Sequence, residues 1–278
     1  MLIIDTHAHI YAEEHVQYPT IDNPIRPPGK SGSVGTLEAL AKANDVTGVC
    51  VVQPGTFYRW DNRFICDVSK AHPKDMAGVC ALDADDANSP RLLHRYVADY
   101  GVRGLRSYAA SDGHLDHPGV QLLWREAEEL GIVVSVFVNR DKTDELARML
   151  EKFPRLSVVI DHCFISKPIA DLGSAVADMI RLAKFSNAYA KLSFVPLGSV
   201  EEYPFRDMHE PCERIIAAFG PERCVWGSNF PCELWTPKSN CAQNLRLFTH
   251  EMGLANGVKE SILGRAARSL WFRDNHLG

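Results

Sequence analysis

The chain has 278 residues, of which 46% are hydrophobic and 23% charged, as is usual for a globular domain in water. Its 30 basic and 35 acidic residues leave a net charge of −5, so nothing in the charge balance points to a nucleic acid partner. No run reaches the roughly 18 apolar residues of a membrane-spanning helix, which argues against a membrane partner.

The start of the chain lacks the basic region and the cleavage site of a signal peptide. The eight cysteines form no Cys-x-x-Cys pair, and Cys50, Cys80 and Cys224 lie within apolar runs. Cysteines of this kind are expected to stay reduced inside a cell. We therefore predict a cytoplasmic protein with free thiols.

The dominant pattern along the chain is an alternation of short, β-branched apolar runs with longer segments of helical period. Several short runs are apolar on both faces, which is typical of a parallel sheet covered by helices. Eight runs are predicted as strands: residues 2–5, 48–53, 76–82, 101–106, 132–138, 156–161, 188–193 and 223–227. Because no Gly-x-Gly-x-x-Gly follows any strand, an α/β fold with a single (β/α)8 TIM barrel over residues 1–278 is favoured over a doubly wound sheet.

A segment rich in proline and glycine, residues 11–35, interrupts the alternation directly after the first strand. Long loops of this kind are uncommon in compact domains and are often functional. In a barrel the segment would lie over the catalytic face, and a surface insertion is the alternative.

Histidines stand at the ends of two predicted strands. His7 and His9 are two residues apart, so in a strand their side chains point to the same side. His162 follows the apolar run of the sixth strand. Since catalytic groups of TIM barrels lie at the carboxyl ends of the strands, the three imidazoles are expected to meet in one site.

The turn after the last strand reads Gly227-Ser228-Asn229-Phe230-Pro231. Together with His7-x-His9 and Asp161-His162, this turn resembles the amidohydrolase-2 (amidohydrolase-related) family, within the lactonase-like TIM-barrel branch of the amidohydrolase superfamily. The resemblance extends over nearly the whole chain. It implies a hydrolase related to lactonases that act on sugar lactones and on pyrone or muconolactone carboxylates, and to some decarboxylases.

Two departures from the family pattern concern the catalytic machinery. Asn229 stands where the family has an aspartate that acts as a general base or a metal ligand, and an amide cannot take up a proton at neutral pH. The fifth strand ends without the histidine of the metal-binding members. We therefore expect no required metal, with activity that survives chelation. The alternative is one divalent metal such as zinc, held by His7, His9 and His162.

Further polar residues at strand ends are candidates for substrate binding. Arg106 is predicted to hold a substrate carboxylate, with a structural ion pair as the alternative. Lys191 lies on a strand where a charge must be paired or face the barrel mouth. Arg59 is placed with the binding residues, with surface solvation as the alternative. Gln53 and Tyr108 complete the set.

The resemblance implies an enzyme that opens a small carboxylated lactone, or a related ester-like ring, by attack of water. His7, His9 and His162 would polarise the carbonyl, and Asn229 would orient the water. Two alternatives remain: a metal-dependent nonoxidative decarboxylase, and a catalytically impaired homologue that binds the ligand. Homo-oligomerisation is compatible with a barrel enzyme.

The role of Asn229 divides the hypotheses further. If Asn229 replaces a general base, by nature or by engineering, Asn229→Asp should raise turnover. If the amide donates a bond that the site needs, the same change should lower turnover.

Overall fold

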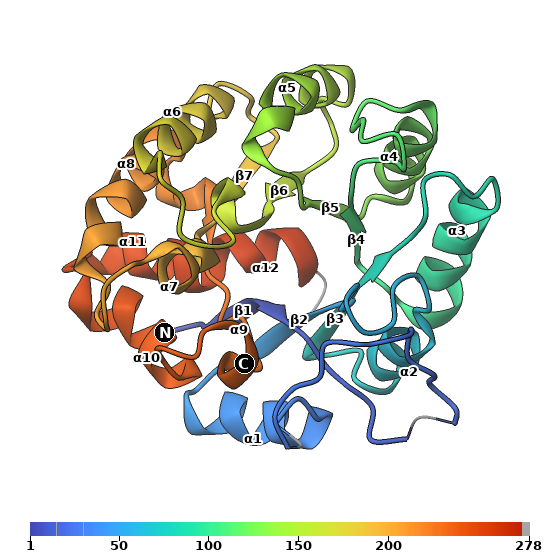
Figure 1. The fold of residues 1–278 in the computed structure, drawn as a ribbon, viewed down its shortest axis with the longest axis horizontal. Coiled ribbons are helices and arrows are strands. Elements are labelled where there is room, and N and C mark those ends of the chain that lie inside the picture. Colours follow the sequence, from blue (N-terminus) through green and yellow to red (C-terminus); the bar gives the residue numbers. More distant parts are fainter. Residues whose placement is uncertain (15, 30, 274–278) are drawn as a thin grey trace.

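Eight parallel strands follow one another around a barrel in the order of the chain (Figure 1). The structure is a computed structural model and describes residues 1–14, 16–29 and 31–273. The predicted (β/α)8 barrel is confirmed. The strands are β1 (Ile4–Ala8), β2 (Gly48–Val52), β3 (Met76–Ala81), β4 (Gly104–Ser107), β5 (Val133–Val136), β6 (Val158–Ile160), β7 (Ala188–Lys191) and β8 (Cys224–Val225).

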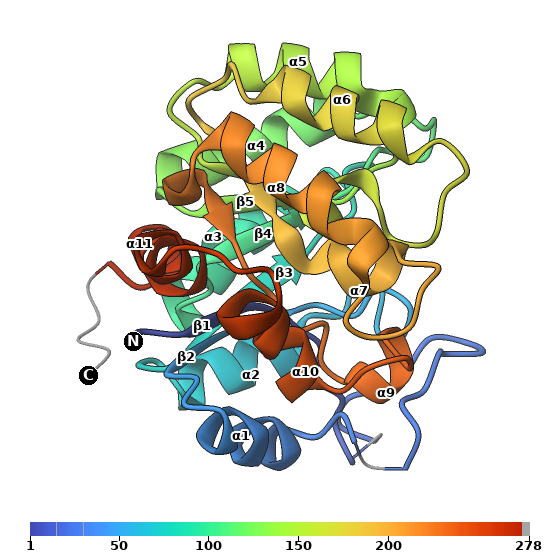
Figure 2. The same cartoon turned by 90° about the vertical axis from the view of Figure 1, so that its left-hand side faces the viewer.

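Helices surround the strands on all sides, as the views in Figures 1 and 2 show together. Gly101 and Gly131 end two of them in the left-handed conformation, each at φ +68°, which glycine adopts without a steric cost. The helices are α1 (Val34–Ala43), α2 (Arg63–Ala71), α3 (Ser89–Tyr100), α4 (Pro118–Leu130), α5 (Thr143–Lys152), α6 (Leu172–Leu182), α7 (Val195–Gly198), α8 (His209–Phe219), α9 (Cys232–Trp235), α10 (Cys241–Arg246), α11 (Asn256–Glu260) and α12 (Ala266–Trp271).

The strands are buried on both faces because the barrel has two apolar layers. Inside, residues such as Ile4, Val79 and Val159 pack with Leu270 and Trp271 of α12. Outside, a larger cluster fills the space between the strands and the helices. The two-sided burial accounts for the continuous apolar runs in the sequence.

The barrel closes between β8 and β1. The backbone N–H of Thr6 donates to the carbonyl of Trp226 at 3.1 Å, and the N–H of Asn229 donates to the carbonyl of His7 at 3.0 Å. Gly227 lies between these bonds, where an added Cβ would stand 2.6 Å from the Cβ of His7. The closure therefore needs glycine at this position, and it brings the last strand beside the first histidine.

The segment over residues 11–35 packs beside the chain that follows β2. The N–H of Ile21 donates to Phe57, and that of Ile25 donates to Thr56. The described residues of the segment do not line the cavity of about 430 Å³ at the carboxyl ends of the strands, although Thr56 does. The segment therefore flanks the catalytic face at the β2 side.

One pair of cysteines departs from the prediction of free thiols. Cys232 and Cys241 form a disulfide between α9 and α10. Cys50, Cys80 and Cys224 are free and buried, in line with their apolar surroundings. Among the described residues, no helix is long and apolar enough to cross a membrane.

We expect Gly227→Ala to lower the free energy of unfolding by about 1–3 kcal/mol, because the new methyl group overpacks the contact with His7. Urea titration followed by circular dichroism measures this loss. Gly257→Ala is the control, since an added Cβ at Gly257 meets nothing within 4 Å. Equal stability of the two variants would contradict the close-approach argument.

Candidate active site

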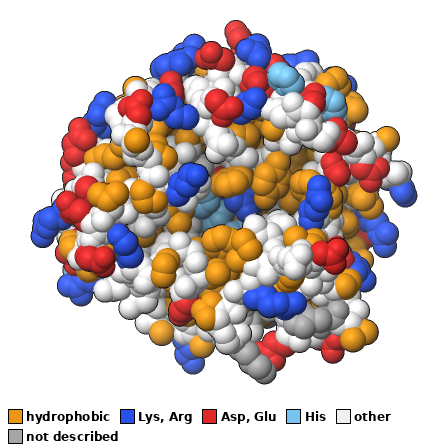
Figure 3. All heavy atoms as spheres, in the orientation of Figure 1, with side chains coloured by type: hydrophobic (Ala, Val, Ile, Leu, Met, Phe, Trp, Pro, Cys, Tyr) orange, Lys and Arg blue, Asp and Glu red, His pale blue; other side chains and the backbone are white. Residues whose placement is uncertain are grey.

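A cavity of about 430 Å³ opens at the carboxyl ends of the strands. Figure 3 shows histidine side chains at the bottom of a hollow near the middle of this face. The cavity is lined by His7, His9, Pro54, Gly55, Thr56, Arg59, Trp60, Arg106, Tyr108, Phe137, His162, Ser166, Leu197, Asn229 and Trp235. Seven of the nine residues predicted for the site are in this lining.

His7 and His9 are held by the end of β1. The Nε2 atoms of the two rings are 3.2 Å apart, and Nδ1 of His9 lies 2.7 Å from the carbonyl oxygen of Val52. That carbonyl can only accept, so Nδ1 of His9 carries the proton and its Nε2 presents a lone pair. A ring fixed in this way is typical of a metal-ligating histidine.

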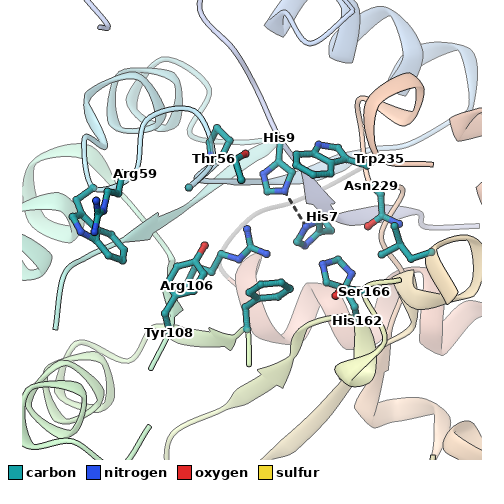
Figure 4. Close-up of a pocket in the computed structure, with 15 residues that line it drawn as sticks. His7, His9, Thr56, Arg59, Arg106, Tyr108, His162, Ser166, Asn229 and Trp235 are labelled. Atoms are coloured by element: carbon teal, nitrogen blue, oxygen red, sulfur yellow. Dashed lines mark hydrogen bonds between the residues drawn. The ribbon is translucent and has the colours of Figure 1, made fainter. Parts of the chain in front are cut away.

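His162 reaches the same place from the other side of the barrel. It follows β6 in a turn where His162 and Cys163 have φ of +53° and +49°, a backbone conformation that these residues seldom adopt. Its ring centroid lies 4.5 Å from that of His7, and its Nδ1 lies 2.7 Å from Oγ of Ser193. The strained turn therefore points the imidazole inward (Figure 4).

All three imidazoles are neutral at physiological pH. Burial is the main cause, and it lowers the pKa of His9 and of His162 to about 3. Burial, with His162 and Lys191 nearby, also lowers the pKa of His7 well below its usual value. The ring nitrogens are therefore available to accept hydrogen bonds or to bind a cation.

A buried ion cluster lies beside the histidines. Oδ1 of Asp161 is 2.7 Å from Nζ of Lys191, and Oδ2 is 3.2 Å from Nε of Arg106. Burial alone would raise the pKa of Asp161, but the charges of Lys191 and Arg106 bring it below its usual value. Nζ of Lys191 is also 3.4 Å from Nδ1 of His7. The cluster thus joins the barrel interior to the histidine site.

Arg106 contributes to both the cluster and the cavity. Its guanidinium carbon lies 4.6 Å from the ring centre of Phe137 and 5.5 Å from that of Tyr108. Figure 4 shows the guanidinium directed toward the space beside His7 and His9. The aromatic rings add to the ion pair with Asp161. Because Lys191 shares the single charge of that carboxylate, the two cations keep a net positive charge that can bind an anion.

Asn229 is positioned by the turn after β8, with φ at +62°. Its Nδ2 donates to the carbonyl oxygen of Ser193 at 2.8 Å. Its Oδ1 is buried and has no hydrogen-bond partner among the described residues. The side chain therefore presents a free acceptor in a cavity that also contains the histidines.

Two residues predicted to bind substrate do not reach the cavity. Lys191 is fully buried beside His7, and its ion pair with Asp161 compensates for the loss of water around its charge. Gln53 is fully buried as well, and its Nε2 donates to the carbonyls of Arg59 and Asp61 at 3.2 and 2.8 Å. Both residues therefore support residues of the site without lining the cavity: Lys191 contacts His7, and Gln53 holds the loop of Arg59.

Sequence reasoning missed three contributors to the site. Asp161 stands in the strand-end motif with His162, and an acid at the end of an apolar strand indicates a partner for the cations predicted on other strands. Phe137 ends the fifth strand and could have been found from that position. Trp235, whose ring centre lies 5.6 Å from that of His9, is the last residue of the short helix α9, which carries no strand-end signal.

A model of the amidohydrolase family matches residues 4–273, nearly the whole chain. The chain belongs to the amidohydrolase family. This confirms the resemblance seen in the sequence and makes the protein an enzyme of the amidohydrolase superfamily.

Known proteins similar to this amidohydrolase include a D-galactarolactone isomerase of Agrobacterium fabrum, 26% identical over 61% of this chain and 62% of the relative. The crystal structure of a probable 2-pyrone-4,6-dicarboxylic acid hydrolase from Acinetobacter baumannii, with citric acid bound, has a TM-score of 0.79 at 20% identity. It matches 97% of this chain and 99% of its own. An amidohydrolase from Burkholderia multivorans with bound zinc has a TM-score of 0.77 at 20% identity, over 97% and 99% of the two chains.

The prediction that no metal is required was wrong. A structure with this fold holds zinc. In the chain described here, His7, Asp161 and His162 each offer one candidate ligand atom, and these three atoms all lie within 4.8 Å of one another. The usual family positions carry no anionic ligand, since Asn229 stands where the family has an aspartate. Asp161 provides one, and two neutral imidazoles with a carboxylate suit a divalent cation such as zinc. The residues present therefore fit the metal.

We expect Asp161→Asn to lower the free energy of unfolding by about 3–5 kcal/mol, because Lys191 and Arg106 lose their buried counter-charge. Denaturant titration measures the effect. Asp144→Asn is the matched control, since the side chain of Asp144 is 75% exposed and pairs with Arg181 at the surface. A loss in Asp161→Asn no larger than that of the control would show that the cluster does not stabilise the fold.

Proposed function

We propose that this amidohydrolase opens a small carboxylated lactone by attack of water on the ring carbonyl. One observation carries the proposal: the Arg106 guanidinium and the neutral imidazoles of His7, His9 and His162 line the same cavity. A guanidinium can bind a carboxylate, and the adjacent imidazoles can interact with a carbonyl. The cavity therefore suits a substrate with a carboxylate near an electrophilic carbonyl.

Arg106 would bind the substrate carboxylate. It is only 6% exposed, so the bond would form away from bulk water, where a charged hydrogen bond is strong. Tyr108 and Phe137, which flank the guanidinium, provide flat apolar surfaces for the ring of the substrate. The carboxylate would thus be fixed while the lactone carbonyl extends toward the histidines.

The candidate metal ligands are His7, His162 and Asp161, with His9 presenting its bare Nε2 beside His7. A divalent cation, when bound there, supplies Lewis-acid polarisation of the carbonyl. The chain itself supplies the orientation of the ligands. Val52 holds the ring of His9, and Ser193 holds the ring of His162.

Asn229 would orient the attacking water. The Oδ1 atom of its side chain is a buried acceptor without a partner among the described residues, and a water hydroxyl donating to it would be held in the cavity. Ser193 fixes the amide, because its carbonyl accepts from Nδ2 of Asn229. The same Ser193 contacts Nδ1 of His162 through its hydroxyl, so one residue aligns both groups.

The test of the function is hydrolysis of a panel of lactones by the zinc-loaded enzyme, with 2-pyrone-4,6-dicarboxylate and galactarolactone among them. Proton NMR distinguishes the ring-opened hydroxy acid from an isomerised lactone or a decarboxylated product. A ring-opened product supports the proposal. Isomerisation or decarboxylation as the main reaction assigns a different chemistry to the site.

We expect removal of metal with a chelator to lower kcat/KM for the best lactone by about 100-fold or more, because Lewis-acid polarisation contributes several kcal/mol. Dialysis without chelator is the control, and addition of zinc should restore the rate. Unchanged activity in protein shown to be metal-free by elemental analysis would overturn the assignment.

We expect Asn229→Asp to lower turnover and stability. The carboxylate would place an oxygen against the Ser193 carbonyl, where the amide now donates at 2.8 Å, and a buried acceptor would lose its donor. The cost is about 1–3 kcal/mol, which corresponds to roughly a fivefold to 150-fold fall in kcat/KM. Steady-state kinetics on both proteins measure it, and a rise in turnover would instead support the view that Asn229 replaces a general base.

A further inference from the structure

The carboxylate among the candidate metal ligands already pairs with two cations. Oδ1 of Asp161 lies 2.7 Å from Nζ of Lys191, and Oδ2 lies 3.2 Å from Nε of Arg106. Both cations are buried with the carboxylate, so bulk water does little to screen the three charges from one another. Lys191 and Arg106 therefore compete with a metal ion for a single negative charge.

The candidate metal ligands and their buried partners carry an excess of one positive charge before any metal binds. Lys191 and Arg106 contribute two positive charges, and Asp161 contributes one negative charge. The imidazoles of His7 and His162 are neutral, because burial lowers the pKa of both rings well below the usual value. A divalent cation would raise the excess to three positive charges, which the low dielectric of the interior makes unfavourable.

The rest of the cavity adds no negative charge. None of the described residues that line it is an aspartate or a glutamate, and Arg59 adds a further cation. Asn229, which lines the cavity with the histidines, is uncharged. The buried Asp5 lines a different cavity, and its carboxylate accepts hydrogen bonds from the N–H of His7 and from the N–H and hydroxyl of Ser228. The missing negative charge must therefore come from a ligand.

Arg106 connects the charge of the ion cluster with the contents of the cavity. It pairs with Asp161 and also lines the cavity, where Figure 4 shows its guanidinium directed toward the space beside His7 and His9. An anion bound to this guanidinium would bring its charge close to the candidate metal ligands. Because Arg106 is buried, the attraction between that anion and a metal ion would be weakly screened.

We propose that a metal ion and an anionic ligand bind this site cooperatively, so that zinc is held firmly only when a carboxylate is bound to Arg106. Lys191 and Arg106 weaken the metal site through their charge, and the carboxylate of the ligand restores the balance. The inference rests on the proposed function, which places the substrate carboxylate on Arg106. It adds that the substrate itself completes the metal site.

Two probes with the same shape and different charge test this coupling without any reaction. Zinc affinity is measured by competition with a chromophoric chelator, in the presence of saturating benzoate or of benzamide, its neutral isostere. On the wild type we expect zinc to bind about tenfold or more tightly with benzoate than with benzamide, within the range of about 5-fold to 150-fold typical of coupled sites. A chelator titration without protein corrects for zinc that benzoate binds in solution.

The coupling must also appear in the binding of the anion. Calorimetry measures the affinity of benzoate for the zinc-loaded and the metal-free wild type. Because coupling between two binding sites is reciprocal, zinc should strengthen benzoate binding by the same factor by which benzoate strengthens zinc binding. Two factors that disagree would show that benzoate acts on zinc outside this site.

Arg106→Gln removes both the anion-binding group and one of the cations that compete for Asp161. It should bind zinc more tightly than the wild type when no anion is present, and it should lose most of the difference between benzoate and benzamide. Arg155→Gln is the matched control, because Arg155 is exposed and pairs with Glu128. His114→Ala removes one residue of a second, more exposed group of candidate ligands. Both controls should keep the difference in full.

The outcomes separate this inference from the proposed function. Equal zinc affinity with benzoate and benzamide, or no zinc binding with either, overturns the inference whatever the lactone panel shows. A difference of about tenfold supports it even when no lactone is hydrolysed, and in that case the proposed reaction is the part that fails. A difference that Arg106→Gln retains in full overturns the role of Arg106. The wild-type comparison decides the coupling even when Arg106→Gln does not fold.

Discussion

The site depends on one buried carboxylate, Asp161, which two cations share. Lys191 comes from β7, Arg106 from β4 and Asp161 from the turn after β6, so the ion cluster connects three parts of the barrel wall. Without the carboxylate, two positive charges would be buried near neutral imidazoles, which the low dielectric of the interior makes costly. Through Lys191 the cluster also contacts His7, and through Arg106 it reaches the cavity. Stability and the geometry of the site therefore share one set of contacts.

Much of the fold could be predicted because the same pattern, an apolar strand followed by a helical segment, recurs eight times along the chain. β2 and β3 are apolar on both faces, and Gly101 and Gly131 mark the ends of two helices. The meeting of His7, His9 and His162 followed from their common place at strand ends. The first strand was predicted too early, at residues 2–5, because the polar Asp5, Thr6 and His7 conceal that β1 continues to Ala8.

The rest of the site depends on pairings that a sequence does not reveal. The sequence leaves open whether Lys191 faces a substrate or an acid, whereas in the structure its Nζ lies 2.7 Å from Oδ1 of Asp161. The position of Gln53 at a strand end predicts a binding residue, but its side chain donates to the carbonyls of Arg59 and Asp61 and so supports the loop that carries Arg59. The disulfide joins Cys232 to Cys241, and no spacing rule for a metal or redox motif predicts that pair.

That disulfide has a consequence for how one wall of the cavity is attached. Cys232 and Cys241 are nine residues apart in sequence, so the bond closes a small covalent loop. Trp235, which lies beside His9, is part of this loop. A protease that cuts one peptide bond between Cys232 and Cys241 would therefore leave the two halves of the protein covalently joined. In denaturant, the barrel up to β8 and the terminal helices α10 to α12 would then separate only after reduction.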